Sequence, residues 1–355
     1  MRSCAVFWYR EVDLKRLRYI LNKLMWAALT ILFVIVFNFF LFRVLPGDPA
    51  RSGIKDPRLT QANILAIQAR FGLDKPVINC FERLNPIKTG SCFINPLETQ
   101  FFIYITNLLK GEMGISFYTR RPVSELIGQR IINTVLLVLP AQLIAILLGT
   151  LGGIIAAWKS HTALDASLLI TSLISWSVPT FWLGIILLMW GSRYGLPLGG
   201  LVTPGGQFAN IWEQLVDNAR HLFIPMLTFV IIVVGEYVII MRSTLLDVLS
   251  EDYILTAKAK GLNTFQILKD HATKNAMLPI VTITALNLGF TVAGAIQIET
   301  VFSYPGVGRA IFEAVSQRDY PLLQYSFLVI AISVVLANLL AELLYSYLDP
   351  RVEAN

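Results

Sequence analysis

Runs of about 20 mostly apolar residues dominate this chain of 355 residues. They lie at Leu24–Val44, Asn133–Ala157, Ser167–Gly191, His221–Met241, Leu278–Glu299 and Leu323–Tyr345. A helix of that length crosses the roughly 30 Å hydrocarbon layer of a bilayer. Hydrophobic residues make up 55% of the chain and charged residues only 15%, a surplus too large for one soluble core. The sequence therefore predicts an all-α membrane protein with six transmembrane helices.

The positions of lysine and arginine predict the orientation of these helices. Residues 1–23 carry six basic side chains against two acidic ones, and residues 242–278 carry five further basic side chains. With six spans both regions lie on one side of the membrane, which the positive-inside rule makes cytoplasmic. Both termini are then cytoplasmic. The net charge of +6 is explained by these topology signals and indicates no nucleic-acid partner.

The spans divide the chain into segments with distinct expected locations. In order these are an N-terminal interfacial helix (1–23), the first span (24–44), a long external loop (45–132) with a helix at Thr60–Phe71, a transmembrane core (133–348) and a cytoplasmic tail (349–355). The core includes a cytoplasmic segment at 242–278, which is too polar to span and too long for a tight turn.

This cytoplasmic segment is expected to be helical. Leucines at 245, 246 and 249 extend the fourth span beyond the membrane. A short helix follows from Asp252 and is expected to end at Gly261, because glycine readily adopts the left-handed conformation that stops a helix. A further helix at Thr264–Ala276 leads back to the fifth span. A short helix projecting from the membrane in this way is suited to contacting a cytoplasmic partner.

Polar residues inside the spans are candidates for function, because ionisable groups at membrane depth are energetically costly. These candidates are Glu236 in the fourth span and Asn287, Gln297 and Glu299 in the fifth. Two interpretations remain open: a polar-lined translocation pathway through a helix bundle, or hydrogen bonds between neighbouring helices.

Glycine and proline positions predict helix packing and bending. Gly149 and Gly153 form a small-residue pair of the kind that allows two helices to approach closely. Pro140 and Pro179 lie inside the second and third runs and are expected to kink them.

Cysteine and motif content bear on the chemistry of the chain. Cys80 and Cys92 both lie in the expected external loop, where a disulfide is permitted, although two free thiols are the alternative. No Cys/His cluster has metal-ligand spacing, and no phosphate-binding Gly-Lys motif, G-x-S-x-G or H-E-x-x-H occurs. We therefore expect no catalytic site, metal or cofactor in this chain. Active transport would need energy from a partner or an ion gradient.

Ordered motifs along most of the chain resemble those of ABC-importer permeases. Residues Asp252-Tyr253, Thr256-Ala257-Lys258-Ala259-Lys260-Gly261-Leu262, His271, Lys274-Asn275-Ala276 and Pro279 resemble the coupling loop of that family. The further landmarks are Leu17–Leu21, Pro46–Pro49, Gly72–Pro76, Gly111–Ser116 with Pro122-Val123, Glu299–Gly308, Arg318–Pro321 and Asp349–Arg351. The chain is most similar to the first of two paired permeases in the dipeptide/oligopeptide/nickel branch.

This resemblance implies a type I ABC-importer permease fold and a set of partners. The implied partners are a second homologous permease, two cytoplasmic ATPases that hold ATP and Mg, and an external substrate-binding protein, assembled in a bacterial or archaeal inner membrane. The residues implied to contact an ATPase are Asp252, Tyr253, Ala257, Lys258, Ala259, Lys260 and Gly261, with the two alanines permitting close docking. Tyr304, Pro305 and Gly306 are implied to help close an outer gate.

The implied function is ATP-driven, binding-protein-dependent import, most commonly of di- and oligopeptides. Nickel, glutathione or oligosaccharide are alternative cargoes of the same machinery, and a gradient-driven transporter or channel without ATPases is a remote alternative. The chain departs from the family at Leu255-Thr256-Ala257, where a Glu-Ala-Ala sequence is usual, and in an insertion at 78–96. That insertion lies where a binding protein would dock, so the resemblance does not determine which cargo is carried.

Overall fold

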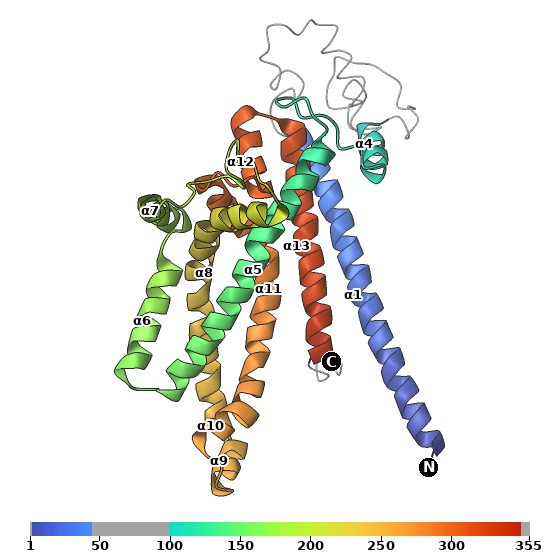
Figure 1. Ribbon diagram of the computed structural model, residues 1–355. Helices are drawn as coiled ribbons and strands as arrows, with labels where there is room; N and C mark the ends of the chain where they lie inside the picture. Colours follow the sequence, from blue (N-terminus) through green and yellow to red (C-terminus); the bar gives the residue numbers. More distant parts are fainter. Residues whose placement is uncertain (1, 45–98, 349–355) are drawn as a thin grey trace, which may run out of the picture. The chain divides into compact units, whose positions relative to one another are not determined.

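The computed structural model describes residues 2–44 and 99–348, and every regular element within them is a helix (Figure 1). The all-α class is therefore confirmed. The expected helix at Thr60–Phe71, the cysteines Cys80 and Cys92 and the tail at 349–355 lie outside the described residues.

The helices follow one another along the chain. They are α1 (Arg2–Val44), α4 (Gln100–Leu109), α5 (Val123–Trp158), α6 (Ala163–Ser177), α7 (Thr180–Arg193), α8 (Ile211–Leu249), α9 (Asp252–Ala259), α10 (Thr264–Gln266), the π-helix η3 (Ile267–Ala272), α11 (Thr273–Val301), α12 (Val307–Gln317) and α13 (Tyr320–Leu348).

Several of these helices have the length and apolar character needed to cross a membrane. In the described part of the chain these are Leu17–Phe42, Val123–Trp158, Ile211–Leu249 and Tyr320–Leu343, and a bent pair of helices would make a fifth span. The expected run at 278–299 lies within the 29-residue α11. The count of six spans stays a prediction.

The third apolar run is not one continuous helix, although its composition predicts a single span. Helices α6 and α7 meet at a bend of 102°. Pro179 causes this break, because a proline has no N–H and forces the preceding residue out of the helical conformation. Val178 accordingly has extended backbone angles of −73° and 130°. By contrast, α5 continues through Pro140 without interruption.

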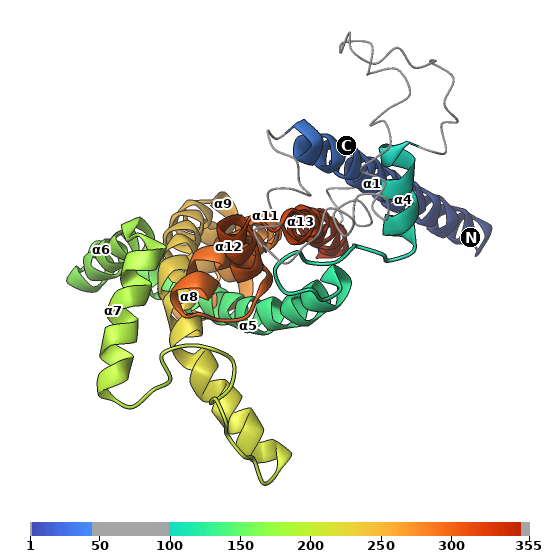
Figure 2. The same ribbon diagram turned by 90° about the horizontal axis from the view of Figure 1, so that it is seen from above.

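Two other helices are longer than their apolar runs. Helix α1 continues from Arg2 to Val44, so the expected interfacial and spanning segments form one helix. Helix α8 begins at Ile211, ahead of the apolar run that starts at His221. Figures 1 and 2 show the first part of α8 (yellow) at an angle to the rest, and Pro225, which lies inside the helix, removes one of its hydrogen bonds.

The chain divides into two compact units. The first comprises Met1–Ala28, Asn133–Pro305 and Ser333–Asn355. The described residues of this unit form two apolar clusters. One is built around Leu137, Ile224 and Phe302, and the other around Tyr237, Leu245 and Ile254. In this unit α6 and α11 each lie alongside α8, with α9 and α10 at one end (Figure 1).

Small residues allow α5 and α8 to approach closely within the first unit. A Cβ atom added at Gly149 would meet the Cβ of Tyr237 and would lie 2.8 Å from the carbonyl oxygen of Val234. One added at Gly153 would lie 2.5 Å from the Cβ of Met241. The prediction that this glycine pair marks a close helix contact is confirmed.

The second unit comprises Leu29–Ile132 and Gly306–Ile332. Its core gathers aromatic and aliphatic side chains from α1, α4, α5, α12 and α13, among them Phe39, Tyr104, Ile127 and Leu328. The ring of Phe39 lies 5.3 Å from that of Tyr104, centroid to centroid. Such aromatic contacts add to the stabilisation from burial.

Candidate functional site

The segment that follows α8 forms the predicted short helix and turn. Helix α8 continues to Leu249, as its leucines predicted, and α9 then runs from Asp252 to Ala259. The chain reverses at Gly261, which has a φ of +80°. Its N–H donates to the carbonyl oxygen of Lys258 at 2.9 Å, and the N–H of Leu262 donates to that of Ala257 at 3.4 Å. This pair of bonds satisfies carbonyls at the end of α9 and defines a Schellman turn.

The segment after this turn is not the single α-helix expected at Thr264–Ala276, because a π-helix interrupts it. Asn263 and Gln266 form a reciprocal capping box, with the Asn263 side chain accepting from the N–H of Gln266 at 2.8 Å. Helix α10 is followed by the π-helix η3, which leads directly into α11. The wider π turn accompanies burial of Ile267 and Leu268 in the core.

Helix α9 has one buried and one exposed face. Ile254 and Ala257 pack into the cluster around Leu245, so Ala257, at 6% exposure, faces the core of its own chain. This corrects the expectation that both alanines face a partner, because the helical period places Ala257 three residues after the buried Ile254. Ala259 is exposed.

The exposed surface of α9, of the turn after it and of α10 combines charged and apolar side chains. Asp252, Lys258, Lys260 and Gly261 are exposed. Three large apolar side chains are exposed beside them, namely Tyr253 (40%), Leu255 (68%) and Phe265 (60%). The hydroxyl of Tyr253 accepts a hydrogen bond from Asn275 Nδ2 at 2.7 Å, which orients its ring. Sequence analysis did not select Leu255 and Phe265 as contact residues, because a single apolar residue in a polar segment does not indicate whether its side chain is buried or exposed.

Two of the predicted membrane-depth residues meet. Asn287 Nδ2 donates to Glu236 Oε2 at 2.8 Å, joining α11 to α8. The adjacent Tyr237 is fully buried, and its hydroxyl accepts from Gln142 Nε2 of α5 at 2.7 Å. Sequence reasoning missed Gln142 and Tyr237. Polar side chains from α5, α8 and α11 are therefore hydrogen-bonded to one another at the level of Glu236 and Tyr237.

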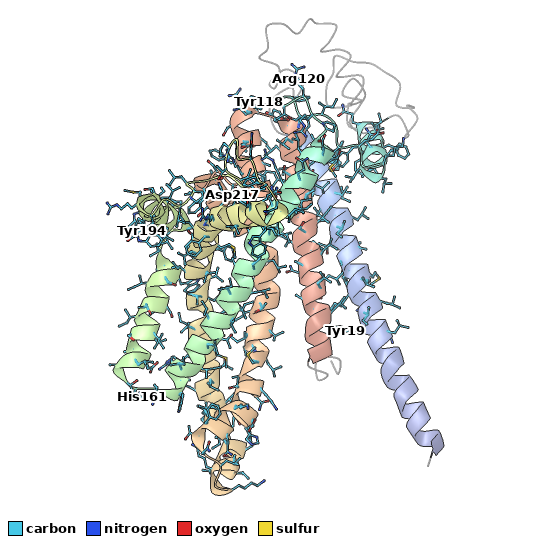
Figure 3. All side chains as sticks on the ribbon, in the orientation of Figure 1. Tyr19, Tyr118, Arg120, His161, Tyr194 and Asp217 are labelled. Atoms are coloured by element: carbon cyan, nitrogen blue, oxygen red, sulfur yellow. The ribbon has the colours of Figure 1, made fainter. Side chains whose placement is uncertain are left out.

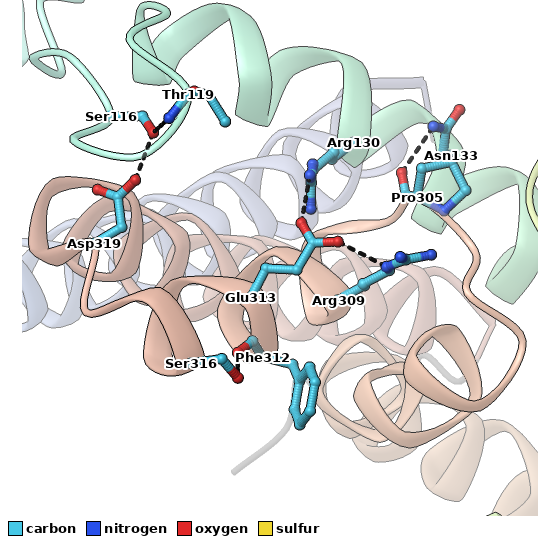
Figure 4. A network of polar contacts seen from close by, with 10 residues as sticks. All are labelled: Ser116, Thr119, Arg130, Asn133, Pro305, Arg309, Phe312, Glu313, Ser316 and Asp319. Carbon is cyan, nitrogen blue, oxygen red and sulfur yellow. Dashed lines mark hydrogen bonds and ion pairs between the residues drawn. The ribbon is translucent and has the colours of Figure 1, made fainter. Parts of the chain in front are cut away.

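A second polar group joins the end of α11 to α5. The carboxylate of Glu299 is fully buried and accepts from the Thr134 hydroxyl at 2.6 Å. The Tyr304 hydroxyl donates to the carbonyl of Asn133 at 3.0 Å, and Asn133 Nδ2 donates to the carbonyl of Pro305 at 2.8 Å (Figure 4). The segment after α11 is thus held against α5.

Electrostatics keep the Tyr304 hydroxyl in one protonation state. Burial, together with the nearby charge of Glu299, raises the pKa of this hydroxyl. The hydroxyl therefore remains a hydrogen-bond donor at neutral pH.

The other two residues predicted for the pathway or gate lie elsewhere. Gln297 is exposed, and Gly306 is the residue that precedes α12.

In the second unit, Asp319 joins two of the sequence landmarks. Its carboxylate is buried and accepts hydrogen bonds from the Ser116 hydroxyl (2.5 Å, Figure 4) and from the N–H groups of Phe117 (3.2 Å), Tyr118 (3.3 Å) and Leu322 (3.3 Å). The loop after α4 and the start of α13 therefore share one acceptor.

Replacing Asp319 with alanine is expected to lower the free energy of unfolding by about 3 kcal/mol, because four donors lose their acceptor. The measurement is the apparent unfolding temperature of the detergent-solubilised protein. Asp247→Ala, at an exposed position of α8, is the control and should leave that temperature unchanged. An unaltered temperature for Asp319→Ala would contradict the assigned role.

An ion-pair group in the same unit links α5 to α12. Glu313 accepts from Arg130 Nη2 and from Arg309 Nε, each at 2.7 Å (Figure 4). Two guanidinium groups share one carboxylate, so the group carries one excess positive charge. Among the described residues, no three His, Cys, Asp or Glu side chains are close enough together to hold a metal ion.

Comparison with known proteins gives the family. The family model described as the binding-protein-dependent transport system inner membrane component matches residues 149–354, more than half of the chain. The chain belongs to this family. A second model, for the N-terminal part of such membrane components, matches residues 16–138 of the permease. The family supplies the transport component of ABC systems and is not their catalytic subunit.

Individual relatives match the permease over nearly its whole length. The glutathione transport system permease protein GsiC of Salmonella typhimurium is 35% identical over 339 residues, covering 95% of this chain and 99% of the relative. The dipeptide permease DppB of Alkalihalophilus pseudofirmus is 32% identical, with 95% and 99% coverage. The oligopeptide permease AppB of Bacillus subtilis is 30% identical, with 94% and 99% coverage. The resemblance inferred from the motifs is confirmed.

Proposed function

We propose that this permease forms half of the translocation pathway of an ATP-driven, binding-protein-dependent importer of small peptides. Family membership carries this proposal, and relatives named as dipeptide, oligopeptide and glutathione permeases support the cargo class. Glutathione is itself a tripeptide, so it belongs to that class. Nickel and oligosaccharide remain alternatives with no support among these named relatives.

The proposed assembly contains a second homologous permease, two cytoplasmic ATPases and an external binding protein. The ATPases would hold ATP and Mg, and the permease itself would need no cofactor. The complex would lie in the bacterial or archaeal inner membrane with both termini of this chain in the cytoplasm, as the distribution of basic residues indicates.

In this proposal the exposed surface of α9, of the turn after it and of α10 docks in a groove of one ATPase. Exposed Tyr253, Leu255 and Phe265 supply the apolar contact that an interface centre needs, and Lys258 and Lys260 supply positive charge at its rim. The tightly packed core beneath α9 passes the movement of the docked ATPase to α8 and α11.

The remaining polar residues are assigned to the pathway and its gate. The pair of Glu236 and Asn287 presents a polar surface at membrane depth, which supports a role in lining the pathway. Glu299, Tyr304 and Pro305 form the hydrogen-bonded segment proposed to close an outer gate.

The experiment is purification of the permease from its native membrane in mild detergent, followed by mass spectrometry. Recovery of two ATPases, a second permease and a binding protein is expected, with a peptide retained by the binding protein. The complex is then reconstituted in proteoliposomes for uptake of that labelled peptide. Recovery of this chain without an ATPase in several detergents would contradict the proposal and favour a gradient-driven carrier.

A further inference from the structure

We propose that the ion pair of Asp165 and Arg242 locks α6 to α8, so that an ATPase acting on α9 moves both helices together. This inference rests on the proposed function, since it specifies how movement spreads from the docking surface. In the sequence, Arg242 was counted only among the basic residues that predict the orientation of the helices, and Asp165 was assigned no role.

The pair has the geometry of a fixed link. Arg242 Nε donates to Asp165 Oδ1 at 2.5 Å, and Arg242 Nη2 donates to Asp165 Oδ2 at 2.7 Å. The Asp165 side chain is 5% exposed and that of Arg242 19% exposed. A bidentate contact between planar groups resists both sliding and rotation, unlike a single hydrogen bond.

The same carboxylate also organises the turn between α5 and α6. Asp165 Oδ2 accepts from the N–H of His161 at 3.0 Å. His161 has a φ of 63°, and it lies in this turn in Figure 3. Thr162 caps the start of α6 by accepting from the N–H of Asp165 at 3.4 Å. Asp165 therefore makes two sets of contacts: it stabilises the first turn of α6, and it binds Arg242 of α8.

Two further contacts hold α6 against α8 along their length. The backbone of Gly235 lies so close to Ser172 that an added Cβ would meet its carbonyl oxygen. The Ser175 hydroxyl donates to the carbonyl of Ile231 at 2.6 Å. These contacts and the ion pair make α6 and α8 a joined pair of helices.

Helix α9 is packed onto the same part of α8 that carries Arg242. Met241 and Leu245, which lie on either side of Arg242 in the sequence, are fully buried. They belong to the apolar cluster that contains Ile254 and Ala257 of α9. A displacement of α9 is therefore passed to this stretch of α8, and through the ion pair to α6.

The test compares variants of the complete importer reconstituted in proteoliposomes with its binding protein. Asp165→Asn and Arg242→Gln are expected to reduce the peptide transported per ATP hydrolysed about tenfold, within the range typical of coupling between sites. ATP hydrolysis itself should stay within about twofold of the wild type, because α9 still docks. The double variant with Asp165→Arg and Arg242→Asp should recover part of the loss.

The control is Arg121→Gln, which removes an exposed arginine–glutamate pair with Glu125 and should leave the ratio unchanged. An unaltered ratio in Asp165→Asn would overturn the inference. So would a parallel fall in transport, ATP hydrolysis and apparent unfolding temperature, because that pattern indicates a structural role alone. A wild-type importer that hydrolyses ATP without moving peptide would instead contradict the proposed cargo.

Discussion

Replacing Gly261 with valine is expected to reduce ATP-driven transport at least tenfold while the chain still enters the membrane. Gly261 has a φ of +80°, and nothing lies within 4 Å of a Cβ added there. The cost is therefore one of backbone conformation, about 2 kcal/mol for a β-branched residue in the left-handed region. Since every 1.4 kcal/mol or so is a factor of about ten in an equilibrium, the Schellman turn that ends α9 would be disfavoured about 30-fold relative to other conformations of this segment.

Three substitutions at this position form a graded series. Asparagine tolerates the left-handed region, so Gly261→Asn should retain most transport, with Gly261→Ala between asparagine and valine. The measurements are peptide uptake and binding-protein-stimulated ATP hydrolysis in proteoliposomes. Equal uptake by the asparagine and valine variants would show that the backbone conformation at Gly261 does not matter for coupling.

Replacing Gly153 with leucine is expected to prevent a stable fold in the membrane. A Cβ at this position would lie 2.5 Å from the Cβ of Met241, 2.8 Å from the carbonyl oxygen of Val238 and 3.0 Å from the backbone nitrogen of Arg242. Backbone atoms cannot move aside as the end of a flexible side chain can, so α5 and α8 would have to separate. The expected loss is more than about 3 kcal/mol of the free energy of unfolding.

The measurement is the yield of monodisperse protein and its apparent unfolding temperature in detergent. Gly128→Ala is the matched control, since it lies in the same helix and nothing is within 4 Å of its added Cβ. That variant should be as stable as the wild type or slightly more so, because alanine is the better helix former. A Gly153→Leu protein as stable as the control would refute the close contact of α5 and α8.

Much of the secondary structure followed from local sequence patterns. Apolar runs located the long helices, and the glycine at 261 located the end of α9, because both signals depend on residues close together in the chain. The family could likewise be inferred, since its motifs are read in order along the chain. Pro179 was expected to kink the third span, as Pro140 was expected to kink the second, and local sequence did not distinguish a kink from the 102° bend that the structure has.

The particular partners of polar and small side chains were decided only by tertiary structure. Sequence analysis selected Glu236 and Asn287 separately, and the packing of α8 against α11 brought them together. Asp165 and Arg242 are 77 residues apart, and Ser116 and Asp319 are 203 residues apart. Such pairs leave no local periodic signal, because each residue meets a partner that the chain reaches much later. The sequence by itself determined that this chain is a helical membrane permease, and the packing of its helices decided which side chains lock α6 to α8 and which face of α9 stays exposed.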